Sequence, residues 1–206
     1  MPTTLKLFSS PGSCSQASHL ALEEAGARYE IVKVDLAGGE QTKPAYLAIN
    51  PKGRVPALVT DRGIITETPA ILLYVAQTHP QARLAPLDDP FALAQVQSFN
   101  NYLSSTVHVA HSHGRRASRW ADDPAAQAAM QAKVSRNMTD CFALIEAQFG
   151  EGPWVMGDAY SICDVYLFTV TGWLEGDGVD YRRFPKVAAH VERMKARPAV
   201  QRVLGA

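Results

Sequence analysis

Segments with strand patterns and segments with helix patterns alternate over the first eighty residues, and the strand patterns then stop. The residues expected in strands are 4–8, 28–36, 55–59 and 63–66, and those expected in helices are 15–25, 43–50 and 68–77. This β-α-β-α-β-β-α order predicts an α/β unit in which helices pack on a sheet, because each apolar face must be buried against another element.

The remainder of the chain has helical spacing only. A proline-rich stretch, THPQARLAPLDDP, separates the two halves and predicts a linker over residues 81–90. Beyond it the spacing predicts helices over residues 90–113, 124–149, 162–174 and 186–197. We therefore expect an α/β domain over residues 1–80 and an all-helical domain over residues 91–206.

The charge and cysteine content limit the possible partners and location. Lysine and arginine number 20, as do aspartate and glutamate, so nothing in the net charge favours a nucleic acid or an anionic membrane as partner. The longest apolar run, residues 162–174, is too short to cross a bilayer, and the first residues show no secretory signal. The three cysteines form no close pair, which favours a reducing compartment. We expect a cytoplasmic protein.

One of these cysteines, Cys14, lies where the first strand gives way to the first helix, within SSPGSCSQ. A thiol in the first turn of a helix faces free backbone N–H groups and the positive end of the helix dipole, which favour its thiolate. The alternative is a small buried residue that only packs. No second cysteine stands at C-x-x-C spacing, so any redox cycle would need an external thiol. Cys141 and Cys163 fall in apolar helical stretches and are expected to pack.

Two further segments could hold a peptide-like ligand. A cis bond before Pro56 would turn the N–H and C=O of Val55 outward as a strand-like grip, whereas the alternative is an ordinary proline at a strand start. Thr68 is expected to cap a helix whose first turn could bind a carboxylate, and Glu67 before it could bind an ammonium group. The alternative for this pair is a capped helix beside a solvated glutamate.

Taken together, the segments PGSCS, NPKGRVPAL and TETPAIL, in this order of elements, closely resemble the glutathione transferase family, and the cysteine placement resembles its bacterial beta class. The resemblance covers nearly the whole chain. It implies a thioredoxin-like domain that binds glutathione as co-substrate and a helical domain that shapes the cleft for the other substrate. By resemblance, Cys14 meets the glutathione sulfur, Val55 before a cis Pro56 holds the cysteinyl backbone, and Glu67 and Thr68 hold the γ-glutamyl end.

The segment FNNYLSSTVHVAHSH resembles the beta-class fourth helix, in which an asparagine and a histidine seven residues later face the active site. The corresponding residues are Asn101 and His108, two helical turns apart, with Ser104 or Ser105 near the same stripe. His108 could donate to a glutathione thiolate or carry a proton near neutral pH.

The residues that follow His108 leave several alternatives. His111 and His113 are expected on a polar helix face; His113 points away from His111 and no acid or cysteine follows at ligand spacing, so we predict no metal site. Arg115, Arg116 and Arg119 either attract anionic glutathione or substrate, or form a solvated surface.

Two more positions complete the site and the core. Many beta-class members have a tyrosine where this chain has Ser9, so Ser9 is the candidate hydroxyl at that position, with Ser10, Ser13 and Ser15 nearby. This departure bears on conjugation chemistry more than on glutathione binding.

Farther along, Ser161 and Asp164 have capping-box spacing, which indicates a structural role for Asp164.

The leading hypothesis is a glutathione transferase, in which the glutathione thiolate attacks a small hydrophobic electrophile. The first alternative is glutathione-dependent thiol–disulfide exchange through a Cys14 mixed disulfide. The second is a non-catalytic protein of the same fold that binds a ligand or a partner. The resemblance also implies a homodimer.

Overall fold

The computed structural model describes residues 4–205, so that residues 1–3 and 206 of the two predicted domains lie outside it. The N-terminal half contains one four-stranded sheet, in the order β2-β1-β3-β4. Strand β1 pairs in parallel with β2 and antiparallel with β3, which in turn pairs antiparallel with β4. The strands are β1 Leu5–Ser9, β2 Tyr29–Lys33, β3 Ala57–Thr60 and β4 Gly63–Thr66. All four expected strands are present, so the predicted element order is confirmed.

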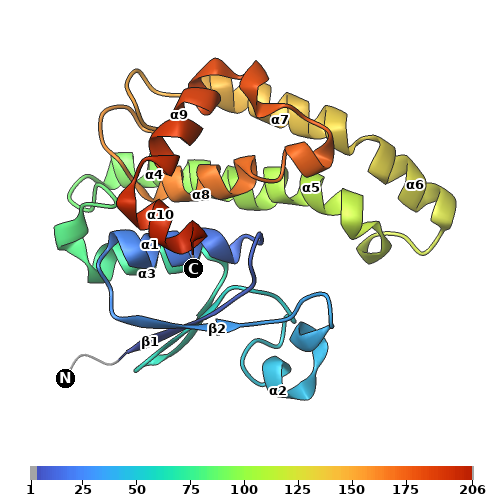
Figure 1. Ribbon diagram of the computed structural model, residues 1–206, viewed down its shortest axis with the longest axis horizontal. Coiled ribbons are helices and arrows are strands. Elements are labelled where there is room, and N and C mark those ends of the chain that lie inside the picture. The colour runs from blue at the N-terminus through green and yellow to red at the C-terminus, as the bar shows by residue number, and fades with distance from the viewer. Residues whose placement is uncertain (1–3, 206) are drawn as a thin grey trace.

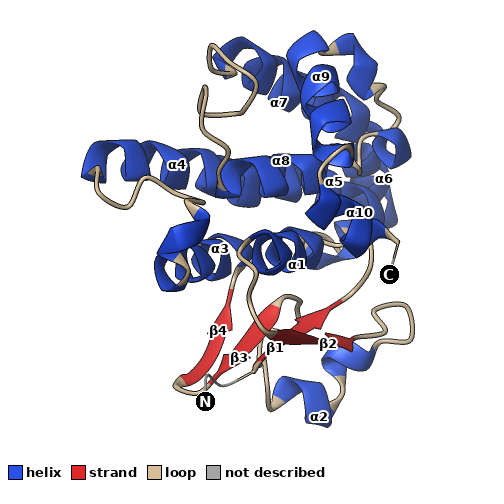
Figure 2. Ribbon diagram, turned by 60° about the vertical axis from the view of Figure 1, so that its left-hand side comes forward, coloured by secondary structure: helices blue, strands red, loops and turns tan. Residues whose placement is uncertain are grey.

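Helices α1 (Ser15–Glu24) and α3 (Thr68–Thr78) cover the face of the sheet that is turned toward the helical domain, and α2 (Pro44–Leu47) lies on the other side (Figure 2). Thr68 was expected to be the N-cap of α3, but it is the first helical residue. The cap position is Glu67, whose side chain makes no capping hydrogen bond. Only Glu67 separates β4 from α3, and it makes the turn with a φ of 73°.

The second half is helical, as expected, and its helices stack above α1 and α3 (Figure 1). They are α4 Pro90–Tyr102, α5 His108–Arg115, α6 Pro124–Ala132, α7 Val134–Gln148, α8 Ile162–Thr171, α9 Pro185–Lys195 and α10 Pro198–Leu204. The helix expected over 124–149 is divided at Lys133, and α10 was not predicted.

The helix expected over residues 90–113 contains a π-helical segment, Leu103–Val107, between α4 and α5. A π-helix bonds i to i+5 and therefore has more residues in each turn than an α-helix. The expectation that Asn101 and His108 lie two turns apart on one face assumed a regular α-helix, and it is wrong for this reason.

Helix α8 is buried along its whole length and begins with the predicted capping box. Asp164 Oδ2 accepts from the Ser161 backbone N–H at 2.7 Å, and the Ser161 Oγ accepts from the Cys163 N–H at 3.2 Å. The other carboxylate oxygen of Asp164 accepts from the Val155 N–H at 2.9 Å and lies 3.1 Å from His190 Nε2. Asp164 therefore joins α8, the preceding loop and α9, as its structural interpretation requires.

One hydrophobic cluster runs through both domains. It includes Leu7 of the sheet and Leu20 of α1 together with Phe142 of α7 and Leu167 of α8. Cys141 and Cys163 belong to this cluster, in keeping with the expectation that both pack. Because the core is continuous, the two domains hold a fixed relation, and the cavity between them has walls from both.

Candidate active site

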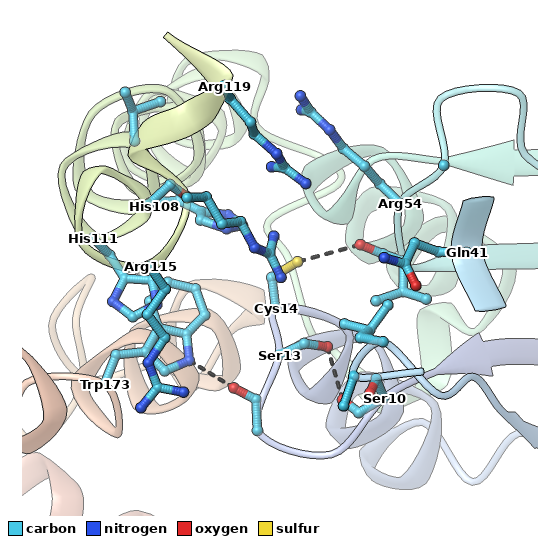
Figure 3. Close-up of a pocket in the computed structure, with 18 of the residues that line it drawn as sticks. Ser10, Ser13, Cys14, Gln41, Arg54, His108, His111, Arg115, Arg119 and Trp173 are labelled. Atoms are coloured by element: carbon cyan, nitrogen blue, oxygen red, sulfur yellow. Dashed lines mark hydrogen bonds between the residues drawn. The ribbon is translucent and has the colours of Figure 1, made fainter. Parts of the chain in front are cut away.

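A cavity of about 550 Å³ lies between the two domains, and Figure 3 shows its main side chains. The N-terminal wall comes from the loop after β1, the loop after β2 and the residues before β3. The helical wall comes from the π-helical segment, α5 and the residues after it, and Trp173 beyond α8. The labelled side chains in Figure 3 are Ser10, Ser13, Cys14, Gln41, Arg54, His108, His111, Arg115, Arg119 and Trp173.

Cys14 occupies the N-cap position of α1 and is 8% exposed. Its Sγ donates to the Val55 carbonyl oxygen at 3.4 Å, and the Val55-Pro56 bond is cis, as the family resemblance implies. Burial raises the pKa of the Cys14 thiol, and a hydrogen bond with Thr68 and the charge of Arg116 oppose this only in part. The expectation that the helix start favours the thiolate is therefore not met, because desolvation of the sulfur outweighs it. Burial therefore favours the neutral thiol of Cys14.

His108 begins α5 and is partly buried, with its ring 4.9 Å from that of Trp173. Burial lowers the pKa of His108 to about 4, and His111 and the charges of Arg116 and other arginines lower it further. The imidazole is therefore neutral at pH 7, so that it can donate one hydrogen bond and accept another.

Trp173 joins the two walls. Its indole Nε1 donates to the Gly12 carbonyl oxygen at 2.9 Å, and its ring stacks on His111 at 4.5 Å between centroids. His111 Nδ1 lies 2.8 Å from an Asp177 oxygen, which fixes the orientation of the imidazole. Sequence reasoning missed Trp173 and gave His111 only a polar helix face. The one sequence feature that could have pointed to Trp173 was its position just beyond an apolar helix.

Glu67 and Thr68 lie at the start of α3, behind the Cys14 thiol. Thr68 is buried and opposes part of the rise in the pKa of Cys14. Glu67 is an exposed carboxylate whose Oε1 lies 2.6 Å from Lys52 Nζ. Neither residue lines the cavity itself, and the same holds for Pro56, the buried residue before β3.

Three further predicted site residues, Ser9, Asn101 and Ser105, do not line the cavity either. The Ser9 Oγ lies 2.8 Å from the Ser15 Oγ and is buried, whereas Ser10 and Ser13 line the cavity. Asn101 and Ser105 are exposed, and the Ser105 hydroxyl donates to the Asn101 carbonyl oxygen at 2.8 Å. Their roles toward glutathione stay predictions.

The arginines that follow α5 do reach the cavity. Arg115 ends α5, Arg116 follows it, and Arg119 ends a short 3₁₀ turn, Ala117–Arg119. All three line the cavity, and Arg54 joins them from the N-terminal wall. Of the two alternatives, attraction of an anion and a solvated surface, this placement supports the first.

Within residues 4–205 there is no group of three or more histidine, cysteine, aspartate or glutamate side chains that could hold a metal ion. Over the same residues, no helix combines the length and apolar character needed to cross a membrane.

Residues 3–77 match the N-terminal domain of glutathione S-transferases, and residues 110–205 match a C-terminal domain of the same proteins. Over 98% of both chains, the sequence is 31% identical to the glutathione S-transferase GstA of Escherichia coli O157:H7. The chain belongs to the glutathione S-transferase family. The family resemblance drawn from its motifs and the prediction of a transferase enzyme are thereby confirmed.

Solved structures of this family support the bacterial beta-class type. A glutathione transferase homologue from Sulfitobacter, with bound glutathione, has 47% identity and a TM-score of 0.95, covering 98% of this chain and 97% of that one. The bacterial beta-class transferase of Sphingomonas chungbukensis has 35% identity and a TM-score of 0.85, covering 97% of each chain. The predicted fold, a thioredoxin-like domain followed by a helical domain, is confirmed as well.

Proposed function

We propose that this transferase binds glutathione with its sulfur between Cys14 and His108, and that the glutathione sulfur, not Cys14, is the nucleophile. The observation that carries this proposal is the burial of the Cys14 sulfur and its hydrogen bond to a carbonyl oxygen. Burial favours the protonated thiol of Cys14, which already donates to a carbonyl oxygen, so it can donate in the same way to a glutathione thiolate.

The charges around the position between Cys14 and His108 favour the thiolate form of the glutathione sulfur. Arg54, Arg116 and Arg119 place positive charge around His108. A ligand sulfur in the open cavity would lie in this field and keep part of its water, whereas the Cys14 side chain is buried, with only 8% of its surface exposed. The field therefore lowers the pKa of the glutathione thiol more effectively than that of Cys14.

The rest of glutathione fits the N-terminal wall. The N–H and C=O of Val55, at the cis bond to Pro56, offer the cysteinyl residue two strand-like hydrogen bonds. The start of α3, with Glu67 and Thr68, would take the γ-glutamyl ammonium and carboxylate. These three contacts are the ones that the family resemblance implies.

In the reaction, the glutathione thiolate attacks an electrophilic carbon and a C–S bond forms. In a substitution, the leaving group departs with the electron pair of the bond that breaks. In an addition to a double bond, the neighbouring carbon takes a proton from water or from a group in the cavity. The cavity contributes position and positive charge to either reaction.

Thiol–disulfide exchange is the second candidate, because Cys14 lines the same cavity. In exchange, the Cys14 thiolate attacks a disulfide of glutathione, one sulfur leaves as a thiolate, and a mixed disulfide forms. Burial opposes the deprotonation that this step requires. A third interpretation, a non-catalytic protein, is less favoured, because relatives such as GstA of Escherichia coli are named glutathione S-transferases.

Replacement of Cys14 by alanine separates conjugation from exchange. If the glutathione sulfur is the nucleophile, Cys14→Ala should retain conjugation of a general electrophile to within about tenfold, the effect of one lost hydrogen bond. Exchange with a mixed disulfide should be lost. Both activities are measured on the same preparation with initial rates, together with glutathione binding by calorimetry.

Cys141→Ala is the matched control, since Cys141 is also 8% exposed but lies outside the cavity. It should leave both activities unchanged. A loss of conjugation by a thousandfold or more in Cys14→Ala, with glutathione still bound, would show that Cys14 is the nucleophile and would overturn the proposal.

We also propose that the enzyme is a cytoplasmic homodimer, as its resemblance to the family implies. Light scattering of the purified protein tests the oligomeric state, and a mass near 45 kDa, about twice the 22.4 kDa of the chain, is expected.

A further inference from the structure

Four guanidinium groups line the cavity, those of Arg54, Arg115, Arg116 and Arg119. In the part of the chain that the structure describes, none of the four forms a salt bridge with a carboxylate. Asp35 is the only acidic residue that lines the cavity in the same part. Since the whole chain has a net charge of zero, this excess of positive charge is a local property of the cavity.

The arginines act on one another. Partial burial lowers the pKa of Arg119, and the charges of Arg116 and Arg54 lower it further. Figure 3 shows Arg119 and Arg54 extending toward the same opening from opposite walls. Like charges held this close repel, and an anion placed among them relieves the repulsion.

Glutathione accounts for only part of this charge. In the proposed binding mode, its γ-glutamyl carboxylate lies at the start of α3, away from the arginines. Its glycyl carboxylate follows the cysteinyl residue held by Val55, and Arg54 is the arginine next to Val55 on that wall. The three arginines of the helical wall, Arg115, Arg116 and Arg119, therefore have no carboxylate of glutathione assigned to them.

The same wall also offers apolar surface. Val109 and Trp120 line it, and the Trp120 side chain is 46% exposed. An aromatic or aliphatic body could lie on these side chains while a charged end reaches the arginines. Arginine binds a carboxylate through two parallel N–H···O bonds, which fixes the orientation of a planar acid.

We propose that the preferred electrophiles of this transferase carry a carboxylate, which Arg115, Arg116 and Arg119 bind on the helical wall. This inference rests on the proposed function and refines its electrophile from a hydrophobic molecule to an organic acid with an apolar body. Arg116 contributes most, because its side chain is less exposed than those of Arg115 and Arg119 and its charge is therefore the least screened by water.

Two glutathione conjugates that differ by one carboxylate test this directly. S-benzylglutathione and S-(4-carboxybenzyl)glutathione occupy both sides of the cavity without any reaction, and calorimetry gives their dissociation constants. We expect the carboxylated conjugate to bind about tenfold more tightly at low salt, the gain typical of one charged hydrogen-bonded pair. The preference should shrink as salt is raised.

Single substitutions to glutamine locate the effect. Arg116→Gln should reduce the preference to about threefold or less, and Arg115→Gln and Arg119→Gln should reduce it by smaller factors. The matched control is Arg62→Gln, which removes the same charge from the turn between β3 and β4. That turn lies at the end of β3 opposite Val55, so this variant should keep the wild-type preference.

The two hypotheses fail in different ways. Equal binding of both conjugates by the wild-type protein, or a preference that survives in all three cavity variants, would overturn the inference and leave the proposed function intact. Failure of both conjugates to bind would overturn the proposed glutathione site and the inference with it. Turnover gives a second check with two electrophiles, 4-chloro-3-nitrobenzoate and 4-chloro-3-nitrobenzamide. For each of them, kcat/KM is divided by the rate constant of its uncatalysed reaction with glutathione, which gives the catalytic enhancement. The enhancement should be larger for the acid than for the amide.

Discussion

The two walls of the cavity present different chemical groups to a ligand. Apart from Arg54 and a few polar side chains, the N-terminal wall presents backbone and small residues such as Gly12 and Ser13, whereas the helical wall presents long charged and aromatic side chains such as Arg116 and Trp120. A backbone wall suits a ligand that is itself a peptide, because its hydrogen bonds are set by the fold. A wall of side chains can change with single substitutions. Under the proposed binding mode, glutathione and the electrophile are therefore recognised by different parts of the chain.

The walls are nevertheless parts of one folding unit. The hydrophobic cluster that contains Leu7 of the sheet also contains Leu167 of α8. Trp173 of the helical domain donates to the carbonyl of Gly12 in the other domain. We therefore expect the chemical difference between the walls to have no counterpart in their stability.

The largest effect should come from Asp164→Ala. Asp164 is fully buried and accepts from Ser161 and Val155 while it contacts His190. Its removal leaves these groups without a partner, which should lower the free energy of unfolding by about 3–5 kcal/mol. Urea unfolding followed by tryptophan fluorescence and by circular dichroism should show one shared transition, because both walls depend on α8.

The control is Asp158→Ala, which removes an exposed carboxylate from the same loop region and should change the free energy of unfolding by less than about 0.5 kcal/mol. Two separate transitions in Asp164→Ala, with the sheet domain the more stable, would show that the walls are independent units.

A smaller effect is the pH dependence of stability that comes from His108 on the helical wall. The pKa of His108 is lowered from 6.5 to about 4 in the folded protein. Between these values the unfolded chain binds a proton that the folded chain does not, so stability falls as the pH drops from about 6.5 to about 4. The slope from this group is at most about 1.4 kcal/mol per pH unit, and His108→Gln should reduce the total slope by that amount.

Nuclear magnetic resonance of the His108 ring measures the pKa of His108 directly. Its signals should not shift between pH 5.5 and 8, and in Arg116→Gln the His108 pKa should rise because one neighbouring positive charge is gone. A midpoint near 6.5 in the wild-type protein would contradict the charge assigned to the helical wall.

The N-terminal wall could be predicted from the sequence in more detail than the helical wall. Strand and turn patterns placed Cys14 between the first strand and the first helix and Val55 at the start of a later strand, because such patterns are local. The motif also implied the cis bond before Pro56, which the structure contains. The state of the Cys14 sulfur could not be predicted, since it depends on burial by residues far along the chain.

The helical wall depends on the register of its helices, and that was the weak point of the prediction. The π-helical segment Leu103–Val107 has no clear sequence signal, and it changes which side chains face the cavity. Trp173 and Asp177 lie far from His111 along the chain, and no local pattern links them to it. The arginines were noticed as a cluster, but only the fold shows that they share a cavity with Cys14.

The smallest effect should come from Trp173→Phe, which tests the link between the walls. Phenylalanine keeps an aromatic ring for His111 but cannot donate to the Gly12 carbonyl oxygen, so the free energy of unfolding should fall by about 1 kcal/mol. Trp120→Phe is the control, because no hydrogen bond from the Trp120 indole holds another element in the described chain, and its stability should be unchanged. If the link orders the loop before Cys14, amide exchange at Gly12 and Ser13 should become faster in Trp173→Phe alone. Unchanged exchange there would mean that the N-terminal wall keeps its shape without help from the helical one.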